Sequence, residues 1–236
     1  AHNEAMNKTG AKGLDEVLQK GHVALDADTF EAMANHEGAM VLDTRSPQDF
    51  AAGHIPNSIF IGIDGSFAPW VGALITDLQQ PIVYVAPAGR EEEVVTRLSR
   101  VGYDNTLGYL AGGVEAWQAA GKETDTLTSI PATAFAERLQ AQSLSVLDVR
   151  KPGEYQAEHV AEAVNFPLDF INDNMDEVHA GQEYYIHCAG GYRSVIAASI
   201  LKSRGIHKLV DVAGGFKAIK ETDIPTTDFV CPSTQI

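Results

Sequence analysis

The sequence contains the same pattern twice, and this internal repeat is the feature that most constrains how the chain can fold. Residues 40–64 (MVLDTRSPQDFAAGHIPNSIFIGID) align without gaps on residues 145–169 (SVLDVRKPGEYQAEHVAEAVNFPLD). Farther along, YLAGGVEAW at 109–117 matches DVAGGFKAI at 211–219, with an offset three residues smaller. The repeat therefore predicts two copies of one domain, joined by a linker.

Each copy alternates between strand-like and helix-like segments. We expect the copies to span 21–124 and 129–236, after an N-terminal tail or linker at 1–20. Short apolar runs such as MVLD and EYYIHC are typical of buried strands, and RSVIAASILKSRG has apolar residues at helical spacing. This alternation predicts an α/β fold in which each domain is a mainly parallel sheet flanked by helices. Cys188 ends the run EYYIHC, at the edge where such sheets bind ligands.

Composition narrows the classes of partner and location. The formal net charge of -15 argues against nucleic acid and against an anionic membrane surface as partners. Two cysteines cannot form a disulfide framework, which favours a reducing compartment and hence a cytoplasmic location. The eight histidines show no ligand spacing, so we expect no metal site, and no organic cofactor is needed.

The stretch CAGGYRS, Cys188 to Ser194, has the residues of a nucleophile loop. If a helix begins near Arg193, its free backbone N–H groups and those of the loop can converge on the sulfur and favour the thiolate. Gly190 and Gly191 allow the backbone to pass close to a bound group, and Arg193 supplies a planar set of donors suited to an oxyanion. A lone strand-end cysteine is more often structural, but two glycines and an arginine before a helix favour a catalytic role.

CAGGYRS, together with VLDVRKPGEY upstream and VAGGF downstream, resembles the rhodanese family of sulfurtransferases. The resemblance extends over both copies and implies that Cys188 accepts a sulfane sulfur and becomes a persulfide. It also implies that the loop residues cradle this group: Ala189, Gly190, Gly191, Tyr192, Arg193 and Ser194. Asp148 and Arg150 match the family's strand-end D-x-R, and we interpret them as a buried structural pair. His159 stands where the family usually has GHIPGA, although the second copy reads EHVAEA, and we expect it to pack and hydrogen-bond rather than transfer protons.

The first copy has no cysteine in the equivalent loop, VAPAGREEE. Arg90 falls near the place of Arg193, and Glu91, Glu92 and Glu93 put negative charge where a thiolate or anionic substrate would lie. Carboxylates there stabilise the first turn of a helix. We therefore expect the first copy to be inactive as a transferase and to act as a scaffold.

Two alternatives to a sulfurtransferase remain open from the sequence. Cysteine phosphatases use a similar loop, but with five residues between cysteine and arginine where this chain has four. A non-catalytic sulfur-carrier or regulatory rhodanese module is the second alternative, and the intact Cys188 loop argues against it.

The predicted reaction moves sulfur from thiosulfate or a low-molecular-weight persulfide to a thiol, or to cyanide, through a Cys188 persulfide. Cys231 could resolve that persulfide as a disulfide, which we regard as the minor alternative for a residue near the chain end. The segment NEAMNKTG resembles the end of the metallo-β-lactamase-like domain in sulfur dioxygenase–rhodanese fusions. That resemblance allows for an N-terminal sulfur dioxygenase domain in the full-length protein.

Overall fold

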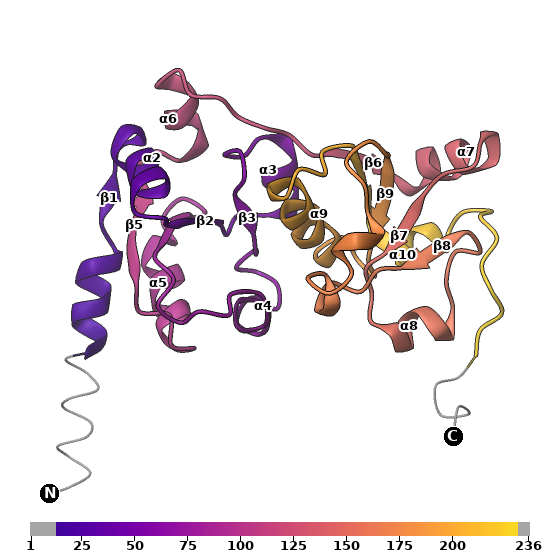
Figure 1. Cartoon of the computed structure of the whole chain (residues 1–236), viewed down its shortest axis with the longest axis horizontal. Coiled ribbons are helices and arrows are strands. Elements are labelled where there is room, and N and C mark those ends of the chain that lie inside the picture. The colour runs from indigo at the N-terminus through magenta and orange to yellow at the C-terminus, as the bar shows by residue number, and fades with distance from the viewer. Residues whose placement is uncertain (1–12, 231–236) are drawn as a thin grey trace, which may run out of the picture. The chain divides into compact units, whose positions relative to one another are not determined.

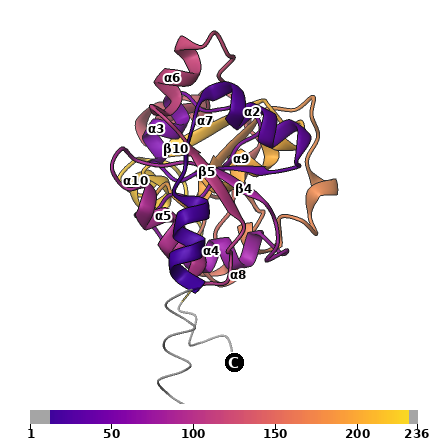
Figure 2. The ribbon, with the colours of Figure 1, turned by 90° about the vertical axis from the view of Figure 1, so that its left-hand side faces the viewer.

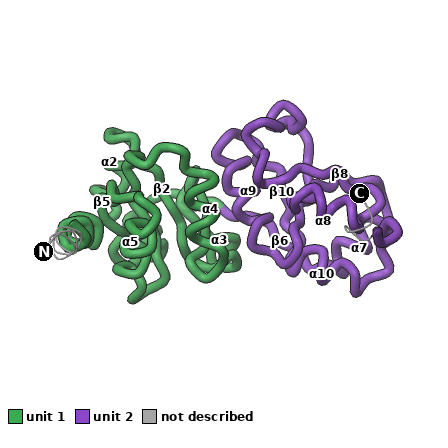
Figure 3. Tube along the Cα trace, turned by 90° about the horizontal axis from the view of Figure 1, so that it is seen from below, with its two compact units in different colours: residues 1–125 green, residues 126–236 purple. Residues whose placement is uncertain are grey.

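The computed structural model describes residues 13–230 of the 236-residue chain. The chain divides into two compact units, residues 1–125 and 126–236, which are coloured separately in Figure 3. Each unit contains one five-stranded sheet in which every paired strand runs parallel to its neighbour. The α/β fold with two tandem parallel-sheet domains is thereby confirmed.

Unit 1 has the strand order β1-β5-β4-β2-β3. Its strands are β1 (Ala24–Leu25), β2 (Met40–Asp43), β3 (Ile59–Phe60), β4 (Ile82–Val85) and β5 (Thr106–Leu110). Its helices are one at 13–21, which begins in the predicted tail and ends at the first residue of the predicted domain, and α2 (Ala27–His36), α3 (Pro47–Ala52), α4 (Phe67–Leu74), α5 (Glu91–Ser99) and α6 (Gly113–Ala119). Figure 2 faces this unit, with β4 and β5 in its middle and helices around them.

Unit 2 repeats this topology with the order β6-β10-β9-β7-β8. Its strands are β6 (Thr128–Pro131), β7 (Val146–Asp148), β8 (Ala163–Asn165), β9 (Tyr184–His187) and β10 (Leu209–Ala213). Its helices are α7 (Ala132–Ala141), α8 (Pro152–Ala157), α9 (Arg193–Ser203) and α10 (Gly215–Ile219), with short 3-10 turns η1 (Leu168–Phe170) and η2 (Met175–Glu177) (Figure 1).

The two faces of the unit 2 sheet are covered by different helices. Phe135 of α7 and Phe216 of α10 pack with Tyr185, Val210 and Val212 in one buried cluster. Side chains alternate along a strand, so Ile186 of β9 and Asp211 of β10 point to the other face. Helix α9 contacts both of these strands and is buried from Ser194 to Lys202. The polar residues at its first turn are thus buried against the sheet.

Candidate active site

Cys188 lies in the turn between β9 and α9, one residue beyond the end of the strand. Its side chain is buried, with the residue 1% exposed. The backbone amide of Gly191 donates to Sγ at 3.1 Å, and the thiol donates to Ser194 Oγ at 3.6 Å. Gly191 has φ of 99°, a conformation that few residues other than glycine adopt easily. The loop therefore folds back so that one of its own amides meets the sulfur.

The cysteine loop is bound by backbone amides at the start of α10, the helix that follows the neighbouring strand β10. The amide of Phe216 donates to the carbonyl of Cys188 at 2.6 Å, and the amide of Lys217 donates to the carbonyl of Ala189 at 3.0 Å. Gly215 has φ of 59°, and a Cβ placed there would lie 2.4 Å from the Cys188 carbonyl oxygen. The glycine pair of VAGGF thus permits the close approach that fixes the backbone of the cysteine loop.

Asp148 and Arg150 form a buried ion pair beside the loop. Arg150 Nη2 donates to Asp148 Oδ2 at 2.7 Å and also to the carbonyl of Glu158 at 2.7 Å. The guanidinium carbon lies 4.0 Å from the centroid of the Phe216 ring. Because the Phe216 amide binds the Cys188 carbonyl, this pair contacts the cysteine loop through the start of α10 rather than through the sulfur.

His159 packs against the end of α8. Its ring stacks on Tyr155 with centroids 3.6 Å apart, and Nδ1 lies 2.7 Å from the carbonyl oxygen of Tyr155. Its backbone amide donates to Thr227 Oγ1 at 3.1 Å. These contacts hold the segment between α8 and β8 in place.

His187 precedes the cysteine, but its ring faces away from the sulfur. Its Nε2 lies 3.8 Å from Asp148 Oδ2, and the ring stacks toward Phe216 at 6.1 Å. Burial lowers the pKa of His187, an effect that the nearby Asp148 carboxylate only partly opposes. The histidine is therefore held neutral on the opposite face of the sheet from Cys188.

Arg193 is the first residue of α9, and its guanidinium forms an ion pair with Glu154 of α8. The two groups form paired hydrogen bonds of 2.7 and 2.9 Å. This pairing raises the pKa of Arg193 and lowers that of Glu154. Glu154 also accepts from the amide of Lys151 at 3.1 Å. Sequence reasoning missed Glu154, although its place in KPGE, three residues after Lys151 at a helix start, is a capping signal.

Asp211 is the second residue that sequence reasoning missed. It lies on β10, is 3% exposed, and accepts from Ser129 Oγ at 3.0 Å. Burial raises its pKa to about 6. The sequence feature that could have identified Asp211 is a carboxylate inside the apolar strand LVDVA, at the position where the first copy has Tyr109.

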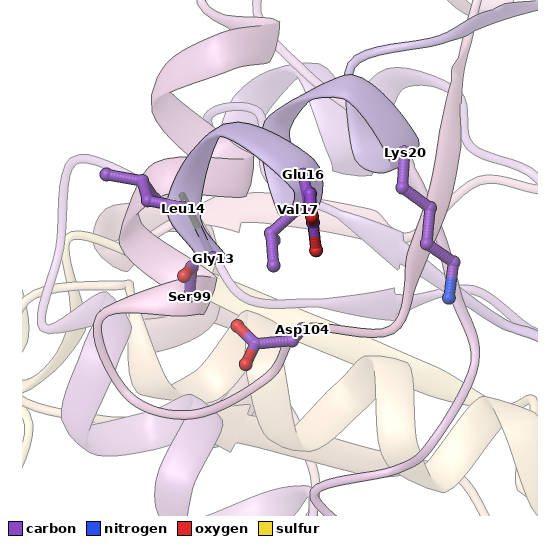
Figure 4. Close-up of a pocket in the computed structure, with 7 residues that line it drawn as sticks. All are labelled: Gly13, Leu14, Glu16, Val17, Lys20, Ser99 and Asp104. Atoms are coloured by element: carbon purple, nitrogen blue, oxygen red, sulfur yellow. The ribbon is translucent and has the colours of Figure 1, made fainter. Parts of the chain in front are cut away.

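Unit 1 has a surface hollow of about 490 Å³, bordered by the helix at 13–21 (Figure 4). Its polar lining includes Glu16, Lys20 and Asp104, and no cysteine. Between residues 13 and 230, no group of three His, Cys, Asp or Glu side chains is placed to hold a metal ion. Over the same residues, no helix is both long and apolar enough to cross a membrane. Cys231 and the segment NEAMNKTG lie outside the described residues.

Comparison with protein families gives the same result for both units. The family described as "Rhodanese-like domain" matches residues 26–120 and 131–222. The chain belongs to the rhodanese-like family. The resemblance inferred from the sequence is thereby confirmed at the level of the family and of the tandem arrangement.

Several relatives match one rhodanese-like domain of the chain. The putative sulfur carrier protein YrkF of Bacillus subtilis is 31% identical over 97 residues, which are 41% of this chain and 52% of YrkF. A sulfurtransferase of Allochromatium vinosum is 24% identical over 100 residues, 42% of this chain and 94% of that protein. The chain spans 52%, 58% and 57% of the length of three curated relatives.

Two solved structures also match the chain. A rhodanese-related protein from Thermoplasma volcanium is 31% identical and covers 42% of this chain and 97% of its own, with a TM-score of 0.39. A thiosulfate sulfurtransferase from Pseudomonas aeruginosa is 18% identical and covers 88% of this rhodanese-like chain and 44% of its own, also with a TM-score of 0.39.

Proposed function

We propose that the chain is a sulfurtransferase that carries sulfur on Cys188 and takes it from thiosulfate or a low-molecular-weight persulfide. The observation that carries the proposal is the placement of Cys188 in a loop whose Gly191 amide donates to Sγ, within a rhodanese-like domain. An amide donor in that position stabilises negative charge on sulfur, whether on the thiolate or on a persulfide.

The reaction has two displacements. The Cys188 thiolate attacks the outer sulfur of thiosulfate, a sulfur–sulfur bond forms at Sγ, and sulfite leaves with the electron pair of the bond that breaks. A persulfide donor reacts in the same way and releases a thiolate. The acceptor, a thiol such as glutathione or cyanide in an assay, then attacks the terminal sulfur and returns Cys188 as a thiolate. No organic cofactor takes part in either displacement.

The proposal includes the location of the reaction and a partner domain. We place the reaction in the cytoplasm, where a reduced thiol acceptor is abundant and Cys188 is kept from forming a disulfide. A sulfur dioxygenase domain at the N-terminal side of the full-length protein would use a persulfide that sulfur transfer to a thiol acceptor forms. We retain that domain as a proposed partner.

The test is intact-protein mass spectrometry after treatment with thiosulfate or glutathione persulfide, followed by an acceptor thiol. The wild type and the matched control Cys231→Ser should gain one sulfur and lose it to the acceptor. Cys188→Ser should gain none and should not turn over. Turnover by Cys188→Ser would refute the mechanism.

The same samples separate the alternatives. A sulfur carrier would gain the sulfur but pass it on in a single turnover only. A cysteine phosphatase would hydrolyse an aryl phosphate, a reaction that we expect to be absent because Arg193 is bound by Glu154 and the loop has four residues between Cys188 and Arg193.

A further inference from the structure

The carbonyl oxygen of Cys188 accepts hydrogen bonds from two groups. The Phe216 amide donates to it at 2.6 Å, and Nδ1 of His187 lies 3.2 Å away. A carbonyl oxygen can only accept, so the second contact requires the imidazole proton to be on Nδ1. All peptide bonds between residues 13 and 230 are trans, and in a trans peptide the N–H points opposite to the C=O. The two donors therefore direct the Ala189 N–H away from His187 and from the start of α10.

The other ring nitrogen of His187 is buried without a partner. His187 is 0% exposed, and its Nε2 makes no hydrogen bond with any residue between 13 and 230. Asp148 Oδ2 lies 3.8 Å from Nε2 and already accepts from Arg150 Nη2 at 2.7 Å. A buried polar atom without a hydrogen bond lowers the stability of the fold, and an apolar side chain would avoid that loss. Stability alone therefore does not account for a histidine at this position.

The imidazole has one proton for its two nitrogens. Burial lowers the pKa of His187, and the Arg150 guanidinium acts in the same direction. The Asp148 carboxylate and the Cys188 carbonyl raise that pKa, but by less than burial lowers it. The ring is therefore neutral at neutral pH. Of its two nitrogens only Nδ1 lies within hydrogen-bond distance of an acceptor, so the geometry favours the tautomer with the proton on Nδ1.

Unit 1 shows that the buried aspartate–arginine pair does not need this histidine. Val85 is paired with Asp43 in the register in which His187 is paired with Asp148. Asp43 nevertheless binds Arg45 at 2.7 Å. The histidine directly precedes the cysteine in unit 2, whereas the valine directly precedes an alanine in unit 1. Within this chain, the polar residue at the strand end therefore accompanies the cysteine and not the ion pair.

We propose that His187 is a positioning residue that orients the peptide between Cys188 and Ala189 through its Nδ1–H tautomer. The bond from Nδ1 adds to that from the Phe216 amide, so the peptide plane is fixed and the Ala189 N–H stays on the side opposite both donors. Loop amides stabilise negative charge on sulfur, and they do so best when their direction is fixed before the reaction. This inference rests on the proposed role of Cys188 as the nucleophile.

The tautomer is tested by heteronuclear NMR of the full chain with nitrogen-labelled histidine, without a sulfur donor. The His187 signals are those that disappear in His187→Asn. Above about pH 6.5, the ordinary pKa of histidine, the ring should have one protonated nitrogen. The unprotonated nitrogen should be the one coupled strongly to both carbon-bound ring protons, which is Nε2. A proton on Nε2 in that pH range, on a neutral or a charged ring, would overturn the proposal.

Two substitutions at this position test the effect on sulfur transfer. His187→Asn keeps an N–H donor near the place of Nδ1, and His187→Val introduces the residue of unit 1. His187→Val should lower kcat with thiosulfate about tenfold, the equivalent of one neutral hydrogen bond. The KM should change less than about twofold, because the ring lies across the sheet from the thiol. His187→Asn should retain kcat within about threefold, and the exposed control His207→Val should have the parent's kinetics.

Thermal denaturation separates positioning from a structural role. His187→Val removes a buried unpaired nitrogen, so it should unfold at the same temperature as the parent or a higher one, despite its lower kcat. An unchanged kcat in His187→Val would overturn the proposal, as would equal losses in His187→Val and His187→Asn, or a lower unfolding temperature of His187→Val. A parent protein that forms no persulfide on Cys188 would refute the proposed function instead, and the NMR spectra would still decide the tautomer.

Discussion

Asp43 and Arg45 in unit 1 make the same contacts as Asp148 and Arg150 in unit 2. Each arginine binds its aspartate through Nε and Nη2. Each Nη2 also donates, at 2.7 Å, to the backbone carbonyl eight residues after the arginine, which is that of Gly53 or Glu158. Both units therefore contain the same arrangement of aspartate, arginine and backbone carbonyl, which we call the Asp–Arg frame.

The histidines that follow this pair are also equivalent. His54 stacks on Phe50 with centroids 3.8 Å apart, and His159 stacks on Tyr155 at 3.6 Å. Each ring has Nδ1 within 2.8 Å of the carbonyl oxygen of its stacking partner. Since a unit without a cysteine has the same arrangement, these contacts belong to the fold and do not require sulfur chemistry.

The loops after the central strands differ. Ala86 follows β4 as Cys188 follows β9, and Glu91 begins α5 as Arg193 begins α9. Arg90, expected near the place of Arg193, instead precedes the helix and binds Glu93 and Asp64. The Asp–Arg frame and the reactive loop are therefore separable, because unit 1 has the frame and a different loop.

The largest expected effect tests that separation directly. Replacing Cys188 by Ala should lower sulfur transfer by at least about a thousandfold, as loss of a nucleophile does. Adding Ala86→Cys to that variant should not restore activity, because Glu91, Glu92 and Glu93 put carboxylates in the first turn of α5, where α9 has Arg193 and Ser194. Steady-state rates with thiosulfate measure both effects, and a restored rate would show that the frame alone makes a sulfur site.

The next effect concerns stability. Asp148→Ala leaves the Arg150 guanidinium buried without its partner, which should lower the free energy of unfolding by about 3–5 kcal/mol. Asp43→Ala should cost less, because the Arg45 side chain is 13% exposed and that of Arg150 is 6% exposed. Urea denaturation measures both losses, with the exposed Asp173→Ala as control. A larger loss for Asp43→Ala would contradict the role of burial.

Asp211→Asn should increase stability above about pH 6. The pKa of Asp211 is about 6 in the folded protein, against an ordinary value of 3.8. The folded state therefore holds this proton more tightly, and stability falls as pH rises between these two values. The ionised carboxylate should cost about 1–3 kcal/mol at pH 8, which the asparagine removes. Denaturation at pH 8 and pH 5 should show the gain shrinking at pH 5, whereas Tyr109→Phe in unit 1 should show no such pH dependence.

The smallest expected effect concerns the arginines at the two helix starts. Glu154→Gln releases Arg193 from a partly exposed ion pair worth about 1 kcal/mol or less, so the KM for thiosulfate should fall by up to about fivefold. The matched change Glu93→Gln, which removes one of the two carboxylate partners of Arg90 in unit 1, should leave the kinetics unchanged. An equal response to the two changes would indicate a general effect of net charge.

The sequence by itself determined the repeat, the parallel α/β fold and the position of Cys188 at a strand end. These features depend on local patterns: apolar runs, helical spacing and glycines at turns are written in consecutive residues. The same patterns also predicted which residues would surround the cysteine in the loop, because a turn of six residues leaves its members little choice of neighbours.

Only the tertiary structure decided which side chains from other elements meet that loop. Glu154 lies 39 residues before Arg193 in the sequence, and Ser129 lies 82 residues before Asp211. Their contacts depend on strand register and on which sheet face a helix covers, and neither is encoded within a short window of sequence. Those long-range contacts pair the Arg193 guanidinium with a carboxylate and bury the Asp211 carboxyl group. They therefore determine the pKa of both side chains, since burial and partners set the ionisation of a side chain.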